Sequence, residues 1–444
     1  MVAVWMESSG GSCWRKSKEA AMTGAEKRRR TPGAGGARSL SWRKQKSLQI
    51  HEALTHDPVD VETLRDAALG EGGLLTPEIR RRVWPKLLSI NVFCLPPKPG
   101  PALRAGHCDY NQVLMDVRRS LKRFPKGMTD VERSVLQEQL IDMILYVLHT
   151  HPELHYYQGF HDVAVTLLLT VGLRLGTAML QTLSTHHLRD FMDPTMERTR
   201  SVLSYLMPLI QSECPALHDF LLRCAVQMGL GAQEFGALDG GGYKIDLARS
   251  LTTTAVVCRS EVGCIFALSW LITWYGHVLS DFHQVLRLYD FFLASHPLMP
   301  VYCAAQMVLM REREVLQCDC DMASVHQLLS RIPSNFPYET LITRTHSFFQ
   351  RRPPSQLERQ TSLQRLKSIS AASFRSLQIS SAQQRPDSVL RQQVAPPSDV
   401  LPARSPNTLV KLAVWGISAS LGAAALAVTQ TALEWGPDLL LGLF

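Results

Sequence analysis

The chain has 444 residues, of which 45% are hydrophobic and 19% are charged, and its formal net charge is +8. This length can bury at least one large core and allows two or three domains. Much of the basic excess lies in the N-terminal arm. There, Lys and Arg are neither interleaved with aromatic residues nor accompanied by a zinc-finger spacing, which argues against a nucleic-acid-binding protein.

The distribution of cysteines indicates the redox state of the compartment in which the protein resides. The ten cysteines are scattered through apolar segments instead of forming a dense framework, which favours a reducing environment. Cys318 and Cys320 form a CxC pair that lacks both the redox CxxC spacing and a second ligand pair for zinc, so we expect structural thiols. The N-terminal MVAVWMESSGG carries no apolar run of the kind found in secretory signals.

Residues 1–47 are rich in Ser, Gly, Lys and Arg without a period, and we predict a disordered basic arm. From residue 48 to about residue 350, apolar residues recur at helical spacing with almost no alternating, strand-like run. The predicted fold class is therefore all-α, as one multi-helix domain over residues 48–350.

The segment DYNQVLMDVRRSLKRFP, residues 109–125, predicts an amphipathic helix. We expect Asp109 to cap its start with Gln112 completing a capping-box-like pattern, and Pro125 to end it. On the helical wheel Arg119 lies opposite the apolar stripe, whereas Arg118 lies near its edge. Asp116 precedes Arg119 by one turn, so its carboxylate can hold the guanidinium.

Two very apolar helices follow. The first begins near Asp130 and stops before Pro152, and the second is VAVTLLLTVGL, residues 163–173. Both are apolar enough to lie in the centre of a bundle. The polar and aromatic stretch HYYQGFHD, residues 155–162, separates them, which predicts a loop or helix start on the rim of the core with Gln158 in its middle.

After residue 350 the composition changes twice. Residues 351–408 are rich in Pro, Ser, Gln and Arg, which predicts a flexible linker. Within it, RQTS and RLKSIS place serines after basic residues, a pattern that attracts kinases but is also common in solvated linkers.

Residues 409–433 are predicted to form a membrane anchor, because residues 412–428 contain no charge, close to the roughly 18 helical residues that cross a thin bilayer. The basic residues before this segment and the acidic residues after it place the bulk of the chain in the cytosol. A buried core helix and a shallow hairpin insertion are the alternatives.

Signatures of metal binding or covalent catalysis do not emerge from the sequence. His151 and His155 stand four residues apart, but Pro152 lies between them and no HExxH glutamate is present. The sequence lacks G-x-S-x-G, and GLGAQEFGALDGGGY is not followed by GK[ST]. We therefore expect neither a metal site nor a cofactor-binding site.

Arg119 and Gln158 remain as candidates for chemistry. Taken singly, each has an ordinary explanation, namely a solvated ion pair and a helix-capping glutamine. Taken together, an extended arginine and a neutral amide between aromatic residues are the groups that a phosphoryl-transfer site needs. The first offsets developing charge and the second orients the attacking water.

Four sequence blocks, in order, resemble the motifs of the TBC-domain family of Rab GTPase-activating proteins. Val113, Asp116 and Arg119 are similar to IxxDxxR with Val for Ile, and Tyr156-Tyr157-Gln158 is similar to YxQ. The family's arginine-VW block and its R-[I/L]-[W/Y]-D block resemble residues 80–84 and 287–290. The phrases STHHLRDFMDPTM and FALSWLITW, with the C-terminal segment, most resemble an ER-anchored branch of the family.

The resemblance implies a catalytic mechanism with two fingers supplied in trans to a GTP-bound Rab partner. Arg119 would be the arginine finger and Gln158 the glutamine finger, with Asp116, Tyr156 and Gly159 in support. The chain would need no cofactor of its own, because GTP and Mg are carried by the Rab. It also implies a place at the endoplasmic reticulum membrane and a role in ER-to-Golgi vesicle traffic, with links to autophagy and lipid droplets.

One departure from the family is a Gly-rich insertion at about residues 225–259, which we expect to be an extruded loop. If it disrupts the domain, the chain would be inactive. The alternative function is a non-catalytic Rab-binding or ER-anchored interaction protein. The retention of both Arg119 and Gln158 favours the catalytic hypothesis.

Overall fold

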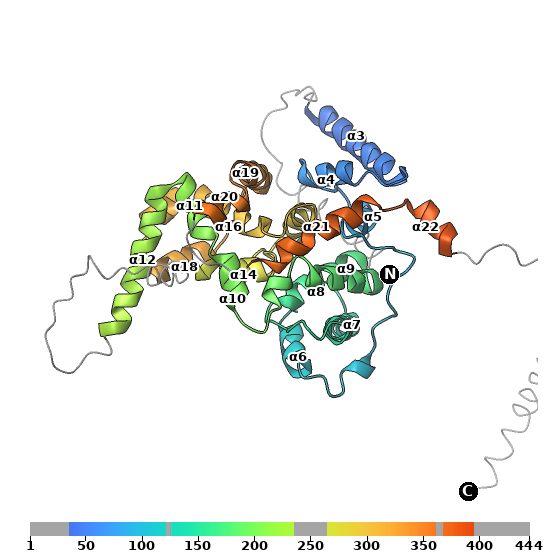
Figure 1. Cartoon of the computed structure of the whole chain (residues 1–444), viewed down its shortest axis with the longest axis horizontal. Helices are drawn as coiled ribbons and strands as arrows, with labels where there is room; N and C mark the ends of the chain where they lie inside the picture. Colours follow the sequence, from blue (N-terminus) through green and yellow to red (C-terminus); the bar gives the residue numbers. More distant parts are fainter. Residues whose placement is uncertain (1–34, 121–124, 126, 235–263, 361–366, 395–444) are drawn as a thin grey trace, which may run out of the picture. The chain divides into compact units, whose positions relative to one another are not determined.

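The computed structural model describes residues 35–120, 125, 127–234, 264–360 and 367–394 (Figure 1). The regular secondary structure of these residues is helical and includes no β-strand, so the prediction of an all-α fold is confirmed for them. The contacts divide the chain into two units, residues 1–390 and residues 391–444, and the helices up to Leu390 belong to the first.

The helices of the described residues, in chain order, are α3 (Gly35–Thr55), α4 (Val61–Leu69), α5 (Pro77–Leu87), the 3₁₀ turn η1 (Pro101–Leu103), α6 (Tyr110–Arg119), α7 (Asp130–Thr150), α8 (Phe160–Val171), α9 (Leu173–Thr185), the 3₁₀ turn η3 (Arg189–Phe191), α10 (Glu197–Leu203), α11 (Leu206–Glu213), α12 (Pro215–Glu234), α14 (Ile265–Ile272), α15 (Phe282–Leu293), α16 (Met299–Met310), α17 (Glu312–Gln317), α18 (Met322–Ser330), α19 (Tyr338–Arg351), α20 (Pro354–Gln360), α21 (Ile369–Ala382) and α22 (Asp387–Val394).

Helix α8 lies at the centre of the N-terminal half. Every residue of Phe160–Val171 is buried, as expected for a helix that is apolar nearly all round, and α8 packs against α5, α7 and α9. Helix α7 begins at Asp130 behind a capping box made by Thr129 and Glu132, and it ends at Thr150 before Pro152, as predicted. These two helices hold the predicted rim loop between them.

An ionic cluster joins two sequence blocks that lie about 200 residues apart. Asp290 of α15 is fully buried and receives hydrogen bonds from the Arg80 guanidinium (Nη2 to Oδ2, 2.8 Å) and from Trp84 Nε1 (2.8 Å), both on α5. The backbone N–H of Leu74 also donates to Asp290, at 3.0 Å. Since a buried carboxylate must be compensated by donors, this cluster fixes α5 against α15.

The predicted disordered arm is wrong for residues 35–47, because α3 begins at Gly35. Helix α3 packs on α4 and buries Ile50 and Leu54. Its polar start is also held: Lys46 Nζ donates to the Glu71 carbonyl at 2.7 Å, and Trp42 lies close to Gly72. These tertiary contacts extend the helix into a stretch that has little apolar period of its own. Residues 1–34 lie outside the described part.

The predicted flexible linker, residues 351–408, is wrong for the segments that form α20, α21 and α22. Helix α21 starts behind Ser368, whose Oγ accepts the Ala371 N–H at 3.0 Å, and it buries Phe374 and Leu377. Ile379 of the same helix is 57% exposed, so tertiary contacts of Phe374 and Leu377, rather than a continuous apolar stripe, stabilise the helix. Residues 361–366 and 395–408 lie outside the described residues.

The predicted insertion loop is partly wrong as well. The backbone of helix α12 continues to Glu234, so residues 225–234 extend a helix, and residues 235–259 lie outside the described part. The predicted membrane anchor, residues 409–433, also lies outside it. Among the residues that the structure describes, no helix combines the length and apolar character needed to span a bilayer.

Candidate functional site

Helix α6 presents Arg119 to solvent while burying the carboxylate that holds it. Val113, Asp116 and Val117 form the buried face, and the side chain of Arg119 is 63% exposed. Arg119 Nη1 lies 3.4 Å from Asp116 Oδ1, one helical turn away, as the spacing predicted. Arg118 is exposed as well, so the contact with Asp116 is what distinguishes Arg119 from its neighbour.

Asp116 is the centre of the site. Its side chain is fully buried, and Oδ2 accepts hydrogen bonds from the Tyr156 hydroxyl at 3.0 Å and from Gln112 Nε2 at 3.1 Å. The predicted capping role of Gln112 is therefore wrong: Asp109 precedes the helix without a side-chain capping bond, and Gln112 reaches forward to Asp116 instead. Since Gln112 and Asp116 are four residues apart, the spacing could have revealed this pair.

Tyr156 links the Arg119 helix to the loop that carries Gln158. Burial, followed by the nearby negative charge of Asp116, raises the pKa of Tyr156 well above its usual value. The hydroxyl therefore keeps its proton and remains a hydrogen-bond donor to the carboxylate. One buried carboxylate thus positions the exposed Arg119 and anchors the residue two positions before Gln158.

The turn around Gln158 is fixed on both sides. The Tyr157 hydroxyl donates to the Ile272 carbonyl at 2.8 Å, and the Phe160 N–H donates to the Tyr157 carbonyl at 3.1 Å. Gly159 has φ of 114°, and a Cβ there would lie 3.0 Å from Thr273 Cγ2. Only glycine fits this conformation without strain, and the turn leaves Gln158 exposed.

A cleft of about 390 Å³ opens beside Gln158. The residues that line it come from the glutamine turn, the start of α8, η3, α10, and α14 with the residues after it: Tyr157, Gln158, Gly159, His161, Asp162, Phe191, Met196, Thr199, Leu268, Ser269, Ile272, Thr273 and His277. The cleft is of a size that accommodates side chains of a partner protein next to the glutamine.

A polar cluster around the buried Asp162 carboxylate lines the same cleft. The Asp162 carboxylate is 3.6 Å from His161 Nε2 and 3.5 Å from His277 Nδ1, while His161 Nδ1 lies 3.5 Å from the Tyr156 hydroxyl. Burial lowers the pKa of His161. Sequence reasoning did not assign Asp162 or His277 to the site. No local signal could have placed His277, which is 115 residues beyond Asp162.

The backbone that backs the glutamine turn is itself strained. Trp274 and Tyr275 follow α14 with φ of 46° and 62°, in the left-handed region that large side chains rarely adopt. Both are buried, and Trp274 packs edge-on against Tyr289 and Phe292. Such conformations persist only where packing imposes them, and this one holds Thr273 against Gly159.

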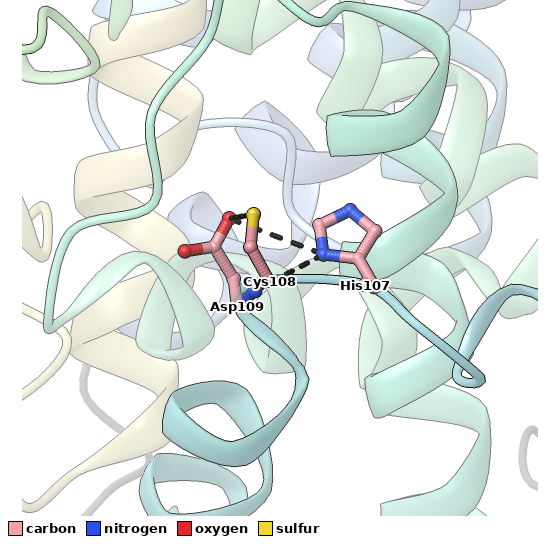
Figure 2. A group of neighbouring side chains, drawn as sticks. All are labelled: His107, Cys108 and Asp109. Carbon is pink, nitrogen blue, oxygen red and sulfur yellow. Dashed lines mark hydrogen bonds and ion pairs between the residues drawn. The ribbon is translucent and has the colours of Figure 1, made fainter.

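One group of potential metal ligands occurs among the described residues, at the opposite end of α6 from Arg119. Figure 2 shows His107, Cys108 and Asp109, whose ligand atoms all lie within 4.8 Å of one another. His107 Nδ1 accepts the Asp109 N–H at 3.2 Å, and Cys108 Sγ donates to Asp109 Oδ2 at 3.5 Å. The three donors already pair among themselves and match none of the ligand spacings that sequence reasoning considered. They take no part in the Arg119 and Gln158 site.

Comparison with known proteins supports the family assignment. Residues 77–232, which include both Arg119 and Gln158, match the Rab-GTPase-TBC domain family. The chain is 53% identical over 421 residues to human TBC1 domain family member 20, covering 92% of this chain and 96% of that protein. This chain belongs to the Rab-GTPase-TBC family. The resemblance predicted from the four sequence blocks is thereby confirmed.

Other relatives of this Rab-GTPase-TBC protein extend to fungi. Mouse TBC1 domain family member 20 is 53% identical over 420 residues, covering 93% of this chain and 96% of its own length. The GTPase-activating protein gyp10 of Schizosaccharomyces pombe is 30% identical over 309 residues, covering 68% and 71%. The crystal structure of the Ypt/Rab-GAP domain of Gyp1p aligns with 69% of this chain and 98% of its own, at 12% identity and a TM-score of 0.48.

Proposed function

We propose that this protein accelerates GTP hydrolysis on a Rab GTPase by supplying Arg119 and Gln158 in trans. The observation that carries the proposal is the buried Asp116, which contacts Arg119 directly and holds Tyr156 two residues before Gln158. An exposed cation and an exposed amide are thus positioned by one carboxylate. Both groups lie in solvent, where a partner protein can reach them.

The proposed roles follow from the chemistry of phosphoryl transfer. Arg119 stabilises the negative charge that develops between the β- and γ-phosphates, and Gln158 orients the attacking water. An arginine supplied in trans is typically worth about 10³ to 10⁵ in rate. Asp116, Tyr156 and Gly159 limit the freedom of the two fingers, which reduces the entropy lost when they enter the nucleotide site. The Rab partner carries GTP and Mg, so this chain supplies no cofactor.

A panel of GTP-loaded Rab proteins in single-turnover phosphate release tests the activity. The unmodified domain accelerates hydrolysis on at least one Rab, whereas Arg119→Ala and Gln158→Ala each lose the acceleration while still binding that Rab. Equal rates in the parent and both variants would refute the two-finger mechanism. Binding without acceleration by the parent would favour the alternative, a non-catalytic Rab-binding protein.

We also propose that residues 409–433 anchor the protein in the endoplasmic reticulum membrane, where it acts on a Rab of the ER-to-Golgi pathway. The absence of charge over residues 412–428, with basic residues before this segment and acidic residues after it, supports this. Removal of residues 409–444 should move the protein from the membrane fraction to the cytosol. A truncated chain that still sediments with membranes would contradict the anchor.

A further inference from the structure

Helix α21 is fastened to the η3 turn through one buried carboxylate. Asp190 is 2% exposed. Its Oδ2 accepts the Ser368 hydroxyl, and its Oδ1 accepts the Ile369 N–H at 2.9 Å. The Asp190 N–H in turn donates to Ser370 Oγ at 3.2 Å. We call Asp190 together with residues 368–370 the α21 latch.

The α21 latch lies directly behind the glutamine turn. Asp190 belongs to η3, and the next residue, Phe191, packs edge-on against Tyr157 with ring centroids 6.3 Å apart and lines the cleft beside Gln158. The Met192 carbonyl accepts the His155 N–H at 2.9 Å. A movement of η3 would therefore displace His155 and Tyr157, the residues on either side of Tyr156.

The latch serine stands in a basic sequence context. Arg365 precedes Ser368 by three residues and Lys367 precedes it by one, the pattern selected by kinases that recognise basic residues. Ser370, the other serine of RLKSIS, is only 2% exposed, whereas Ser368 is half-buried at the very start of α21. Opening of the first turn of α21 exposes Ser368 before it exposes Ser370.

We propose that Ser368 is a phosphorylation site, and that its modification releases helix α21 from Asp190 and loosens the Gln158 turn. The second part rests on the proposed function of Gln158. In the reaction, Ser368 Oγ bonds to the γ-phosphorus of ATP, the bond from that phosphorus to the β-phosphate oxygen breaks, and ADP leaves. The hydroxyl proton passes to the catalytic base of the kinase.

Electrostatics decides the direction of the effect. A phosphate at a helix start is ordinarily stabilising, because it meets the positive end of the helix dipole. Here the group that faces Ser368 Oγ is a buried carboxylate, and phosphorylation replaces the donated O–H with a dianion beside it. Two arginines of the neighbouring segment, Arg189 and Arg198, lie 3.6 Å and 3.4 Å from Asp193, and Arg198 also donates to the Lys367 carbonyl. Repulsion between the phosphate and the Asp190 carboxylate therefore outweighs the favourable interaction with the helix dipole, and α21 separates from η3.

The release can be measured on the full chain carrying phosphoserine at position 368, incorporated during translation. Phosphoserine at position 376 is the matched control, because Ser376 is an exposed residue of the same helix. We expect amide hydrogen exchange in α21 and in residues 155–160 to rise about tenfold or more for phosphoserine 368 and to stay unchanged for phosphoserine 376. Unchanged or slower exchange in α21 would overturn the release.

A charge-removing variant separates repulsion from simple loss of packing. Asp190→Asn keeps an oxygen for the Ile369 N–H and offers an amide donor to the phosphate, so it should restore the protection of α21 in the phosphoserine 368 protein. A phosphorylated Asp190→Asn chain that exchanges as fast as the phosphorylated parent would refute the electrostatic mechanism.

The link to Gln158 has its own readout. With a responsive Rab, phosphoserine 368 should lower kcat by about tenfold and leave KM for the GTP-loaded Rab nearly unchanged, because the turn loses position while the docking surface persists. An open α21 with an unchanged kcat would overturn the link. If the unmodified chain activates no Rab, the proposed function fails, while the exchange at residues 155–160 still tests the latch.

The modification itself is tested with ATP and a kinase that requires arginine three residues before its serine. Mass spectrometry of the full chain should locate phosphate on Ser368, and Ser368→Ala should abolish that signal. A complete absence of phosphate at position 368 under conditions that modify a control peptide of the same sequence would overturn the assignment.

Discussion

Two arginine–aspartate pairs of this protein use the same chemistry for opposite purposes. In the Arg80–Asp290 pair both side chains are buried, at 8% and 0% exposure, and Trp84 adds a further hydrogen bond. In the Arg119–Asp116 pair the carboxylate is equally buried, but the arginine is 63% exposed. The first pair joins α5 to α15. The second leaves the Arg119 guanidinium in solvent, where the proposed function requires it, and the experiments below test whether this difference in exposure separates a structural from a catalytic arginine.

The largest expected effect concerns the exposed arginine. Arg119→Ala should reduce the rate of Rab-bound GTP hydrolysis by about 10³ to 10⁵, because charge stabilisation is lost. Its free energy of unfolding should fall by no more than about 1 kcal/mol, because the Arg119 side chain is exposed and Tyr156 and Gln112 still donate to Asp116. Single-turnover kinetics and urea unfolding measure the two quantities. Arg118→Ala, on the same helix, is the control and should alter neither.

Arg80→Ala should show the reverse pattern. Removal of one partner leaves Asp290 charged and buried, which costs about 3–5 kcal/mol of stability. Under conditions where the variant remains folded, its hydrolysis rate should match that of the parent. Arg82→Ala, an exposed position on the same helix, should cost less than about 0.5 kcal/mol. A stable Arg80→Ala protein with impaired catalysis would contradict the contrast between the two pairs.

Tyr156→Phe tests the hydrogen bond that supports the Arg119–Asp116 pair. The substitution removes a hydrogen bond to a buried carboxylate, so we expect a stability loss of about 1.5–3 kcal/mol. The rate should fall about tenfold, because Asp116 positions Arg119 less firmly. Tyr157→Phe is the comparison: it removes a bond to a neutral carbonyl and should cost only about 1 kcal/mol.

Gly159→Ala tests the glutamine turn. An added Cβ at φ of 114° would approach Thr273 Cγ2 to 3.0 Å, so strain and contact together should cost about 1–3 kcal/mol and lower the rate. Gly106 also has a positive φ, of 84°, but an added Cβ meets no atom within 4 Å. Gly106→Ala should therefore cost less, and an equal loss in the two variants would show that the Thr273 contact is unimportant.

The smallest expected effect is a pH dependence of the free energy of unfolding, which arises from His187. Burial lowers the pKa of His187, which packs against Trp274 and Phe374, to about 3. Between about pH 6.5 and pH 3 the unfolded chain binds a proton at this residue and the folded chain does not, so stability falls as the pH falls through that window.

The contribution of this histidine is at most about 1.4 kcal/mol per pH unit. Urea unfolding at pH 7.5 and pH 5.5 should therefore give a smaller difference for His187→Leu than for the parent. Equal differences in the two proteins would mean that His187 does not contribute.

Local periodicity accounts for much of what could be predicted. The apolar pattern gave α7 and α8 with nearly correct ends, and the wheel of α6 placed Arg119 outside, whereas the burial of Asp116 was not predicted. Prediction failed where tertiary contacts overrule composition. Helix α3 is polar on average and α21 lacks a continuous apolar stripe, and packing on α4 and capping next to Asp190 stabilise the two helices respectively.

By itself, the sequence determined that α7 and α8 are helices and that Arg119 of α6 faces the solvent, and it singled out Arg119 and Gln158 as candidates for phosphoryl transfer. These properties depend on residues within one or two helical turns, whose geometry is set by the backbone. Only the tertiary structure decided that Tyr156 shares Asp116 with Arg119, that Asp290 joins Arg80, and that Ser368 meets Asp190. Such pairs are 40 to 210 residues apart, and packing of the whole domain brings them together.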